Sequence, residues 1–184
     1  MQYIIVGTGG QGVLFTSKVL GHIAMTRGEN ILGSEVHGMA QRGGSVVSHF
    51  KVGSYASPLV KKGDADILLA FDQNEAVRSL DFLKNGGALV VNVHDRELWN
   101  NEPLKRYIEK KQICVHTMAG YDILKEHMEG RFIFMNALIL GAMCGADIGA
   151  PSFEEVKEAV IALSPSKFKD DNVKAAELGY KAVQ

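Results

Sequence analysis

Two glycine-rich segments, each following a short apolar run, constrain this chain more than any other feature. Residues 7–12 read Gly-Thr-Gly-Gly-Gln-Gly and follow the apolar run 3–6. Residues 35–46 read Glu-Val-His-Gly-Met-Ala-Gln-Arg-Gly-Gly-Ser-Val and follow Ile31 and Leu32. Glycines allow tight turns and close approach to a ligand, but ordering them costs chain entropy. We therefore expect the denser second segment to face a ligand or a partner chain.

Apolar, β-branched runs alternate with amphipathic segments along the rest of the chain. The runs predict strands at 2–6, 30–34, 46–52, 65–71, 88–93 and 113–116. The amphipathic segments predict helices at 12–27, 73–83, 103–111, 121–129, 134–145, 153–163 and 170–183. This alternation predicts an α/β fold, a three-layer α/β/α Rossmann-like arrangement with a mostly parallel sheet. The 46–58 region breaks the alternation and leaves room for an antiparallel strand or hairpin.

Local signals refine three of these elements. Residues 35–45 are expected to form a loop, with one helical turn at 36–41. The turn residues 85–87, Asn-Gly-Gly, are expected to close the helix 73–83. In the helix 12–27, one buried apolar stripe is expected, formed by Leu14, Val19, Leu20, Ile23 and Ala24.

Length and composition favour a single domain, residues 1–184, with a substantial core, because 46% of the 184 residues are hydrophobic. A net charge of −1 and a pI of about 6.6 provide no basic excess for nucleic-acid binding. The apolar stretch 132–146 is interrupted by polar and glycine residues, and a membrane span needs roughly 20 apolar residues. It is therefore expected to be a buried helix. No secretory signal is visible, so we expect a cytoplasmic protein.

The two cysteines, Cys114 and Cys144, lie far apart in the sequence and form no Cys-x-x-Cys pair. Alone they cannot supply the ligands of a zinc ribbon or of a four-cysteine iron–sulfur cluster. We expect two reduced thiols in the core, because free cysteine is among the most buried residue types. No histidine spacing typical of a metal site is present, so no metal site is predicted.

The first glycine segment has the Gly-x-Gly-x-x-Gly spacing of a phosphate-binding turn, at Gly7, Gly9 and Gly12. Free N–H groups and the helix dipole at the start of helix 12–27 favour an anion. Glu35 stands near the end of the second predicted strand, where a dinucleotide fold keeps its ribose-binding acid. A tight strand-to-helix connection with no nucleotide fits the same spacing. Both interpretations remain open from this segment alone.

Arg42, Gly43 and Gly44 form the second candidate site for an anion. The guanidinium group presents a planar fork of donors, and the glycine N–H groups can form a concave nest. An arginine that is merely exposed on a loop is the alternative. His37 in the same loop has no Ser, Cys or Asp placed around it as in a nucleophile motif, so we expect a polar contact there.

Polar residues outside the glycine segments are expected to serve the fold. Asp72 ends a buried strand at the edge where such sheets bind ligands, but a cap of the following helix is favoured. Asn136 lies within an apolar helix and needs a hydrogen-bond partner there. His49 is expected to be structural. Ser152 and Glu155 match a capping box.

Taken together, the two glycine segments resemble the gamma subunits of the 2-oxoacid:ferredoxin oxidoreductases. The resemblance is closest to the small (beta) subunits of the indolepyruvate type, because the loop begins Val-His-Gly-Met at 36–39 in place of a Tyr-Gly feature. The loop 35–46 is the most specific part of the resemblance, which spans nearly the full length. Supporting features are the turn 9–12, the segments 57–59 and 65–71, and Asn136, Gly141, Asn172, Ala176 and Gly179.

The resemblance implies a division of labour within an enzyme that decarboxylates a 2-oxoacid to an acyl-CoA and passes electrons to ferredoxin. Larger partner subunits of that enzyme carry thiamine diphosphate and iron–sulfur clusters. This chain is expected to hold no cofactor and no catalytic residue, and to contact its partners near the entrance for substrate or coenzyme A. In isolation, a homodimer is compatible with it. The implied ligand or interface residues are Gly9, Gly10, Gln11, Gly12, His37, Gln41, Arg42, Gly43 and Gly44.

Two other functions compete with this one. A free-standing oxidoreductase that binds NAD(P) or a flavin would use Gly7, Gly9, Gly12 and Glu35. A non-catalytic scaffold would share the fold and assemble with partners without influencing turnover. Neither alternative involves nucleic acid or a membrane.

Overall fold

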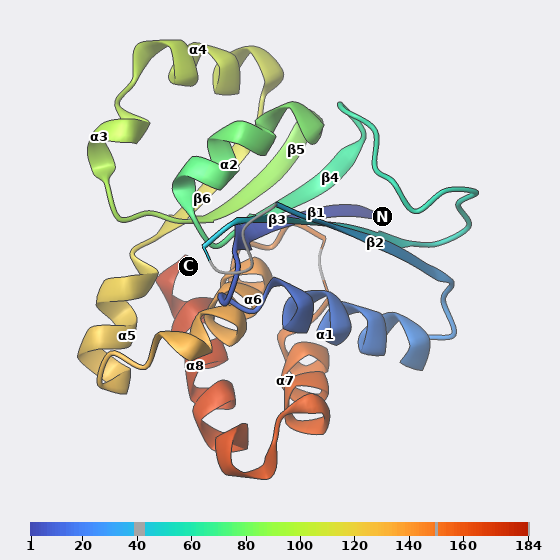
Figure 1. Ribbon diagram of the computed structural model, residues 1–184, viewed down its shortest axis with the longest axis vertical. Coiled ribbons are helices and arrows are strands. Elements are labelled where there is room, and N and C mark those ends of the chain that lie inside the picture. The colour runs from blue at the N-terminus through green and yellow to red at the C-terminus, as the bar shows by residue number, and fades with distance from the viewer. Residues whose placement is uncertain (39–42, 150, 184) are drawn as a thin grey trace.

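A six-stranded mixed sheet forms the centre of the computed structural model, which describes residues 1–38, 43–149 and 151–183. The strand order is β2-β3-β1-β4-β5-β6 (Figure 1). The strands are β1 (Gln2–Thr8), β2 (Ile31–His37), β3 (Ser45–Val52), β4 (Ala65–Ala70), β5 (Leu83–Asn92) and β6 (Cys114–Met118). β1, β4, β5 and β6 are parallel, whereas β3 runs antiparallel to both β1 and β2. The predicted fold class and the antiparallel addition near residue 46 are thus confirmed.

Helices cover both faces of the sheet (Figure 1). One face carries α1 (Val13–Thr26), α5 (Gly120–Met128), α6 (Met135–Gly145), α7 (Phe153–Leu163) and α8 (Lys169–Ala182). The other carries α2 (Gln73–Ser79), α3 (Arg96–Trp99) and α4 (Glu102–Lys111). Short 3₁₀ turns lie at Leu80–Phe82, Phe132–Phe134 and Ser166–Phe168.

Alternation along β1 links the sequence to these two layers. Ile5 points into the larger core under α1 and α6, while Ile4 and Val6 point into the smaller core under α2 and α4. All three side chains are 0% exposed. Continuous apolar runs mark strands that are buried on both faces. The first apolar run of the sequence is therefore the centre of the sheet.

The largest helix contact, between α6 and α8, depends on glycine. A Cβ atom added to Gly141 would lie 1.9 Å from the carbonyl oxygen of Ala176, and one added to Gly179 would lie 1.9 Å from that of Leu138. Only hydrogen side chains allow the two backbones to approach this closely. This seam, which we define as Gly141 and Gly179 with their facing carbonyls, explains two glycines that the family resemblance had singled out.

Four predictions about local structure are wrong. β2 continues through Val36 and His37, where a loop with a helical turn was expected, because both residues pair with β3. The Asn-Gly-Gly run at 85–87 lies inside β5, where the register shifts between Ala65 and Ile67 and the extra residues bulge outward. Cys114 is exposed on an outer strand, and Leu14 is 39% exposed on α1.

Candidate functional site

The carboxyl edge of β1 brings the two glycine-rich segments together. Gly9 follows β1, and its N–H donates to the carbonyl oxygen of Gly44 at 2.9 Å. The strand register places Thr8 opposite Ser45, so Gly44 precedes the first paired residue of β3. Gly38, just after β2, donates its N–H to the carbonyl oxygen of Ser45 at 2.8 Å. Segments that are some 30 residues apart therefore form one surface, which we call the glycine edge (residues 8–12, 38 and 43–45).

Gln11 supports the glycine turn from within. Its Oε1 accepts the N–H of Thr8 at 2.7 Å, and its Nε2 donates to the hydroxyl oxygen of Tyr121 at 3.0 Å. The N–H of Gln11 also donates to the carbonyl oxygen of Thr8 at 3.1 Å. The side chain predicted to face a ligand is thus engaged in holding the turn to the start of α5.

Gly12 begins α1 in a backbone conformation and an environment that both require glycine. Its φ of 88° lies in the left-handed region, and no side chain caps the helix there. A Cβ atom would lie 2.5 Å from Nδ2 of Asn136 at the start of α6. Asn136 accepts the N–H of Ala137 through Oδ1 at 2.7 Å. Its structural role is confirmed, and its side chain fixes how closely α6 approaches the turn.

A buried carboxylate, which the sequence interpretation missed, lies beside the second glycine segment. Glu75 on α2 is 5% exposed. It accepts the hydroxyl hydrogen of Ser45 at 2.6 Å and a hydrogen from Nη1 of Arg78 at 2.6 Å. The side chain of Arg78 is 71% exposed, so its remaining donors reach solvent. The spacing of Glu75 and Arg78, three residues apart on a predicted helix, was the available signal.

An aromatic row extends the glycine edge toward α5. The ring of Tyr121 packs edge-to-face against His94 at 6.0 Å and against Phe132 at 5.3 Å between centroids. Phe132 is 42% exposed and its neighbour Ile133 is 56% exposed. Gln11 joins this row to the turn through the Tyr121 hydroxyl. No sequence pattern connects these rings, because they come from three separate segments, the loop after β5, helix α5 and the turn Phe132–Phe134, which meet only in the fold.

Buried polar side chains brace the loops at the same edge. Oε1 of Gln73 accepts the N–H groups of His94 and Asp95 at 2.9 and 3.0 Å. Asn92 donates to the carbonyl oxygen of Phe71 at 3.1 Å and accepts the N–H of Gly120 at 2.9 Å. These bonds fix the loops after β4, β5 and β6, so the edge is a rigid platform.

Two expected structural roles, those of Asp72 and His49, are confirmed. Asp72 caps α2 by accepting the N–H groups of Asn74 and Glu75 at 2.8 and 3.2 Å. His49 on β3 accepts the N–H of Val60 through Nδ1 at 3.1 Å, and burial lowers its pKa from the ordinary value.

Three of the predicted site residues cannot be placed on this surface. Gln41 and Arg42 lie outside the described residues, as does the side chain of His37. Anion binding by Arg42 therefore stays a prediction. The other six predicted residues, Gly9, Gly10, Gln11, Gly12, Gly43 and Gly44, are brought together in the glycine edge.

The topology disfavours a dinucleotide site. In a dinucleotide fold the strand that carries the ribose-binding acid lies beside β1. Here β3 separates β2 from β1, so Glu35 lies two strand spacings away, about 10 Å. The N–H groups of Thr8 and Gly9, which such a turn would offer to phosphate, already bind Gln11 and Gly44.

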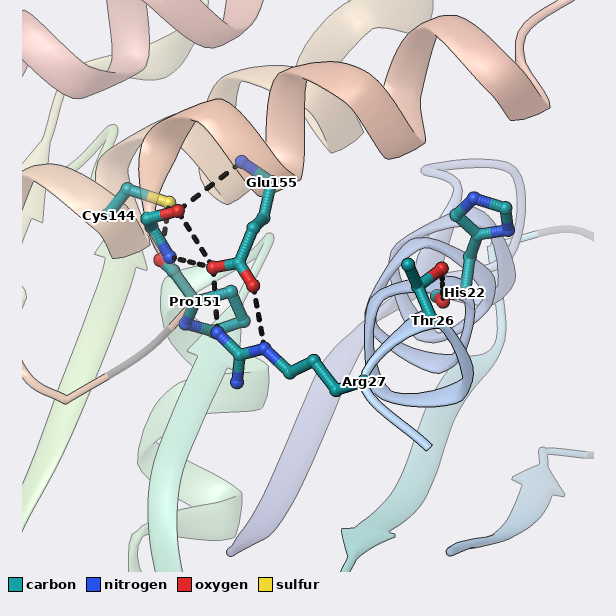
Figure 2. A network of polar contacts seen from close by, with 7 residues as sticks. His22, Thr26, Arg27, Cys144, Pro151 and Glu155 are labelled. Atoms are coloured by element: carbon teal, nitrogen blue, oxygen red, sulfur yellow. Dashed lines mark hydrogen bonds and ion pairs between the residues drawn. The ribbon is translucent and has the colours of Figure 1, made fainter. Parts of the chain in front are cut away.

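A separate polar network, at the far end of α1, joins that helix to α7 (Figure 2). Arg27 donates from Nε and Nη2 to the two carboxylate oxygens of Glu155 at 2.6 and 2.7 Å. Glu155 also completes the predicted capping box with Ser152. These bonds lower the pKa of Glu155 to about 2, with Arg27 as the largest cause.

Cys144 lies against the same network but is no candidate nucleophile. Its Sγ donates to the carbonyl oxygen of Pro151 at 3.3 Å (Figure 2). Burial, together with the nearby Glu155 carboxylate, raises the pKa of its thiol to about 12. A thiol that stays protonated at neutral pH is a poor nucleophile and a poor metal ligand.

The described part of the chain holds neither a cluster of metal-binding side chains nor a membrane-spanning helix. Within residues 1–38, 43–149 and 151–183, no group of three or more His, Cys, Asp or Glu is placed to hold a metal ion. In the same ranges, no helix has both the length and the apolar character needed to cross a membrane.

Comparison with known proteins identifies the family of this chain. The sequence pattern of the family "Pyruvate ferredoxin/flavodoxin oxidoreductase" matches residues 2–182. The chain belongs to this family. Among its relatives in the pyruvate ferredoxin/flavodoxin oxidoreductase family is indolepyruvate oxidoreductase subunit IorB of Thermococcus kodakarensis, 34% identical over 98% of this chain and 95% of that protein. IorB of Archaeoglobus fulgidus is 31% identical over 98% and 94%.

A solved structure of the family has the same fold. The gamma subunit of a keto/oxoacid ferredoxin oxidoreductase from Geobacter sulfurreducens superposes with a TM-score of 0.75. It is 24% identical, and the superposition covers 99% of this chain and 97% of that one. Small subunits are thus matched from end to end, in sequence and in fold.

Proposed function

We propose that this chain is the small subunit of a 2-oxoacid:ferredoxin oxidoreductase, with indolepyruvate as the leading substrate. The observation that carries the proposal is the end-to-end match to small subunits of this family. The enzyme would convert the 2-oxoacid and coenzyme A to an acyl-CoA and pass electrons to ferredoxin. Residues 1–184 would act as one domain, in the cytoplasm, and would not be catalytic alone.

On this proposal the cofactors belong to other chains. Larger subunits would hold thiamine diphosphate and iron–sulfur clusters, which supply the decarboxylation and the electron transfer. The chemistry of the described residues fits this division, because the polar groups of the glycine edge mostly bind one another. A platform of this kind can position a partner loop or line an entrance.

The glycine edge would face the larger subunit at the entrance for substrate or coenzyme A. Arg78 supports this role, because its exposed guanidinium group suits a carboxylate or a phosphate. Arg42 is predicted to add a second positive charge at the same edge. The half-exposed Phe132 and Ile133 supply apolar surface beside them. Both kinds of surface are typical of the rim and centre of an interface.

Anaerobic purification of the tagged chain from its native cells tests the subunit role. We expect a larger iron–sulfur chain to co-purify, with brown absorbance that a 2-oxoacid and coenzyme A bleach. A colourless chain that elutes alone would overturn the proposal. Titration of that chain with NAD(P) and flavins would then test the free-standing alternative.

The assembled enzyme tests the site. Arg42→Ala is expected to lower kcat/KM about tenfold or more while assembly is preserved, because a charge-assisted hydrogen bond is lost. Arg106→Ala on α4, far from the glycine edge, is the matched control and should leave turnover unchanged. Unchanged kinetics and assembly in the Arg42 variant would remove the assignment of this loop.

A further inference from the structure

Of the two strands that border the sheet, β2 is longer than β6, with seven residues against five. It forms the outer strand of the sheet and pairs only with β3 in the described part of the chain (Figure 1). Its seven residues, Ile-Leu-Gly-Ser-Glu-Val-His, include no proline and no lysine. Natural edge strands usually carry such residues, or bulges, which prevent pairing with another chain.

The hydrogen-bond pattern shows which groups point outward from this edge. Gly38 donates to Ser45, so the even-numbered residues of β2 form the hydrogen-bonded pairs with β3. Val52, opposite Ile31, exchanges both of its backbone bonds with Met1 and leaves none for β2. The N–H and C=O groups of Ile31 and Gly33 therefore point away from the sheet, ready to pair with a further strand.

We propose that β2 pairs with β2 of a second copy of this chain, antiparallel about a two-fold axis at Ser34. This register joins two six-stranded sheets into one. Ser34 lies opposite Ser34, Leu32 opposite Val36, and Gly33 opposite Glu35. Because the outward-pointing residues are the odd-numbered ones, this register pairs them with each other, as an antiparallel ladder requires.

The side chains of β2 favour a second copy of this chain as the source of the strand that pairs with it. Val36 is 51% exposed, and in this register it lies opposite Leu32 of the second copy. The two-fold axis repeats this pair, so the Val36 side chain of each copy is covered. Shifting the pairing by two residues would set Glu35 opposite its own copy, and like charges directly opposite destabilise a strand pair. The axis at Ser34 avoids this repulsion and places the apolar side chains of Val36 and Leu32 opposite each other.

The groove beside β2 adds charge complementarity to this arrangement. A groove of about 540 Å³ lies between α1 and the β2–β3 hairpin and is lined by Gly33, Glu35, Lys18 and His22. In the proposed register Glu35 of each copy lies over Gly33 of the other, where no side chain fills the space. The carboxylate of each copy thereby approaches Lys18 of its partner.

The oligomeric state of the isolated chain provides the first test. Sedimentation equilibrium should give a dimer, and Val36→Lys should raise its dissociation constant at least tenfold, because a lysine is placed against Leu32 of the other copy. Thr117→Lys, on the opposite outer strand β6, is the matched control and should leave the dimer intact. A monomeric chain, or a dimer unaffected by the lysine at position 36, would overturn the proposal.

Cross-linking tests the register itself. Ser34→Cys in a Cys114→Ser background should oxidise to a covalent dimer, because a non-hydrogen-bonded pair places the two Cα atoms about 4.5 Å apart. Thr117→Cys in the same background should stay monomeric on a denaturing gel. If β2 instead binds the larger subunit, the isolated chain stays monomeric and Val36→Lys weakens co-purification, which also rejects a second copy as the occupant. This test is independent of the proposed enzymatic role.

Discussion

Glycine is required in two regions of this molecule for different physical reasons. In the α6–α8 seam, Gly141 and Gly179 lie in ordinary helical backbone, and any side chain would collide with a carbonyl oxygen. At the glycine edge, Gly12 has a left-handed backbone, and the atoms nearest to an added Cβ all belong to the side chain of Asn136. Backbone atoms fill the space beside the seam glycines, whereas a side chain, which can move, fills the space beside Gly12. Family glycines can thus mark either the core or the site.

The seam should show the largest effect. Gly141→Ala is expected to destabilise the chain by about 3 kcal/mol or more, or to prevent folding, since a Cβ atom cannot fit 1.9 Å from a backbone oxygen. Gly21→Ala is the matched control, because this helical glycine has ordinary contacts of 3.5 Å or longer. It should stabilise by about 0.5–1 kcal/mol. Urea unfolding measures both variants, and equal effects would show that crowding at the seam is unimportant.

A substitution at the glycine edge should lower the free energy of unfolding less than one at the seam. Gly12→Ala is expected to cost about 1–2 kcal/mol for its left-handed backbone, in addition to the contact with Asn136. Combining it with Asn136→Ala should recover the stability lost through the contact with Asn136. The loss due to the left-handed backbone should remain. A double-mutant cycle in urea measures this coupling. Purely additive effects would mean that Asn136 does not limit the space at Gly12.

The Arg27–Glu155 pair lies outside both glycine regions and should show the smallest effect. The pKa of Glu155 is lowered from 4.5 to about 2, so its contribution is fully present above pH 4.5 and is lost as the pH falls toward 2. Arg27→Met should flatten this pH dependence and cost about 1 kcal/mol or less at pH 7. Lys157→Met, which breaks the exposed pair with Glu177, should leave the acid dependence unchanged. Parallel urea curves at several pH values distinguish the two variants.

The sequence predicted the layers and the strands of the sheet better than it predicted where individual strands begin and end. Long apolar runs and periodic helices have local signatures, so the elements were found and the interruption near residue 46 correctly indicated an antiparallel strand. Val36 was misread because its strand pairing depends on β3. The Asn-Gly-Gly run at 85–87 was misread because a bulge and a turn use the same residues.

The candidate site was only half accessible to sequence reasoning. The glycine segments were recognisable as motifs, yet Glu75 and Tyr121 were not, since their roles come from contacts between residues distant in the chain. The side chain of Gln11 binds the N–H of Thr8 and the hydroxyl of Tyr121, and its part in a ligand or interface site stays a prediction. Local patterns thus located the candidate site, and the fold determined which of its described groups bind one another.

The β2–β3 hairpin has a consequence for how such subunits diverge. Its strands are paired from Ile31 with Val52 to His37 with Val46, and its two ends at the site are tied by the bonds of Gly38 and Gly44. The residues between those ties can therefore be exchanged without re-registering the sheet. Sequence changes within this segment can thus alter the surface at the glycine edge while the strand pairing that supports it is unchanged.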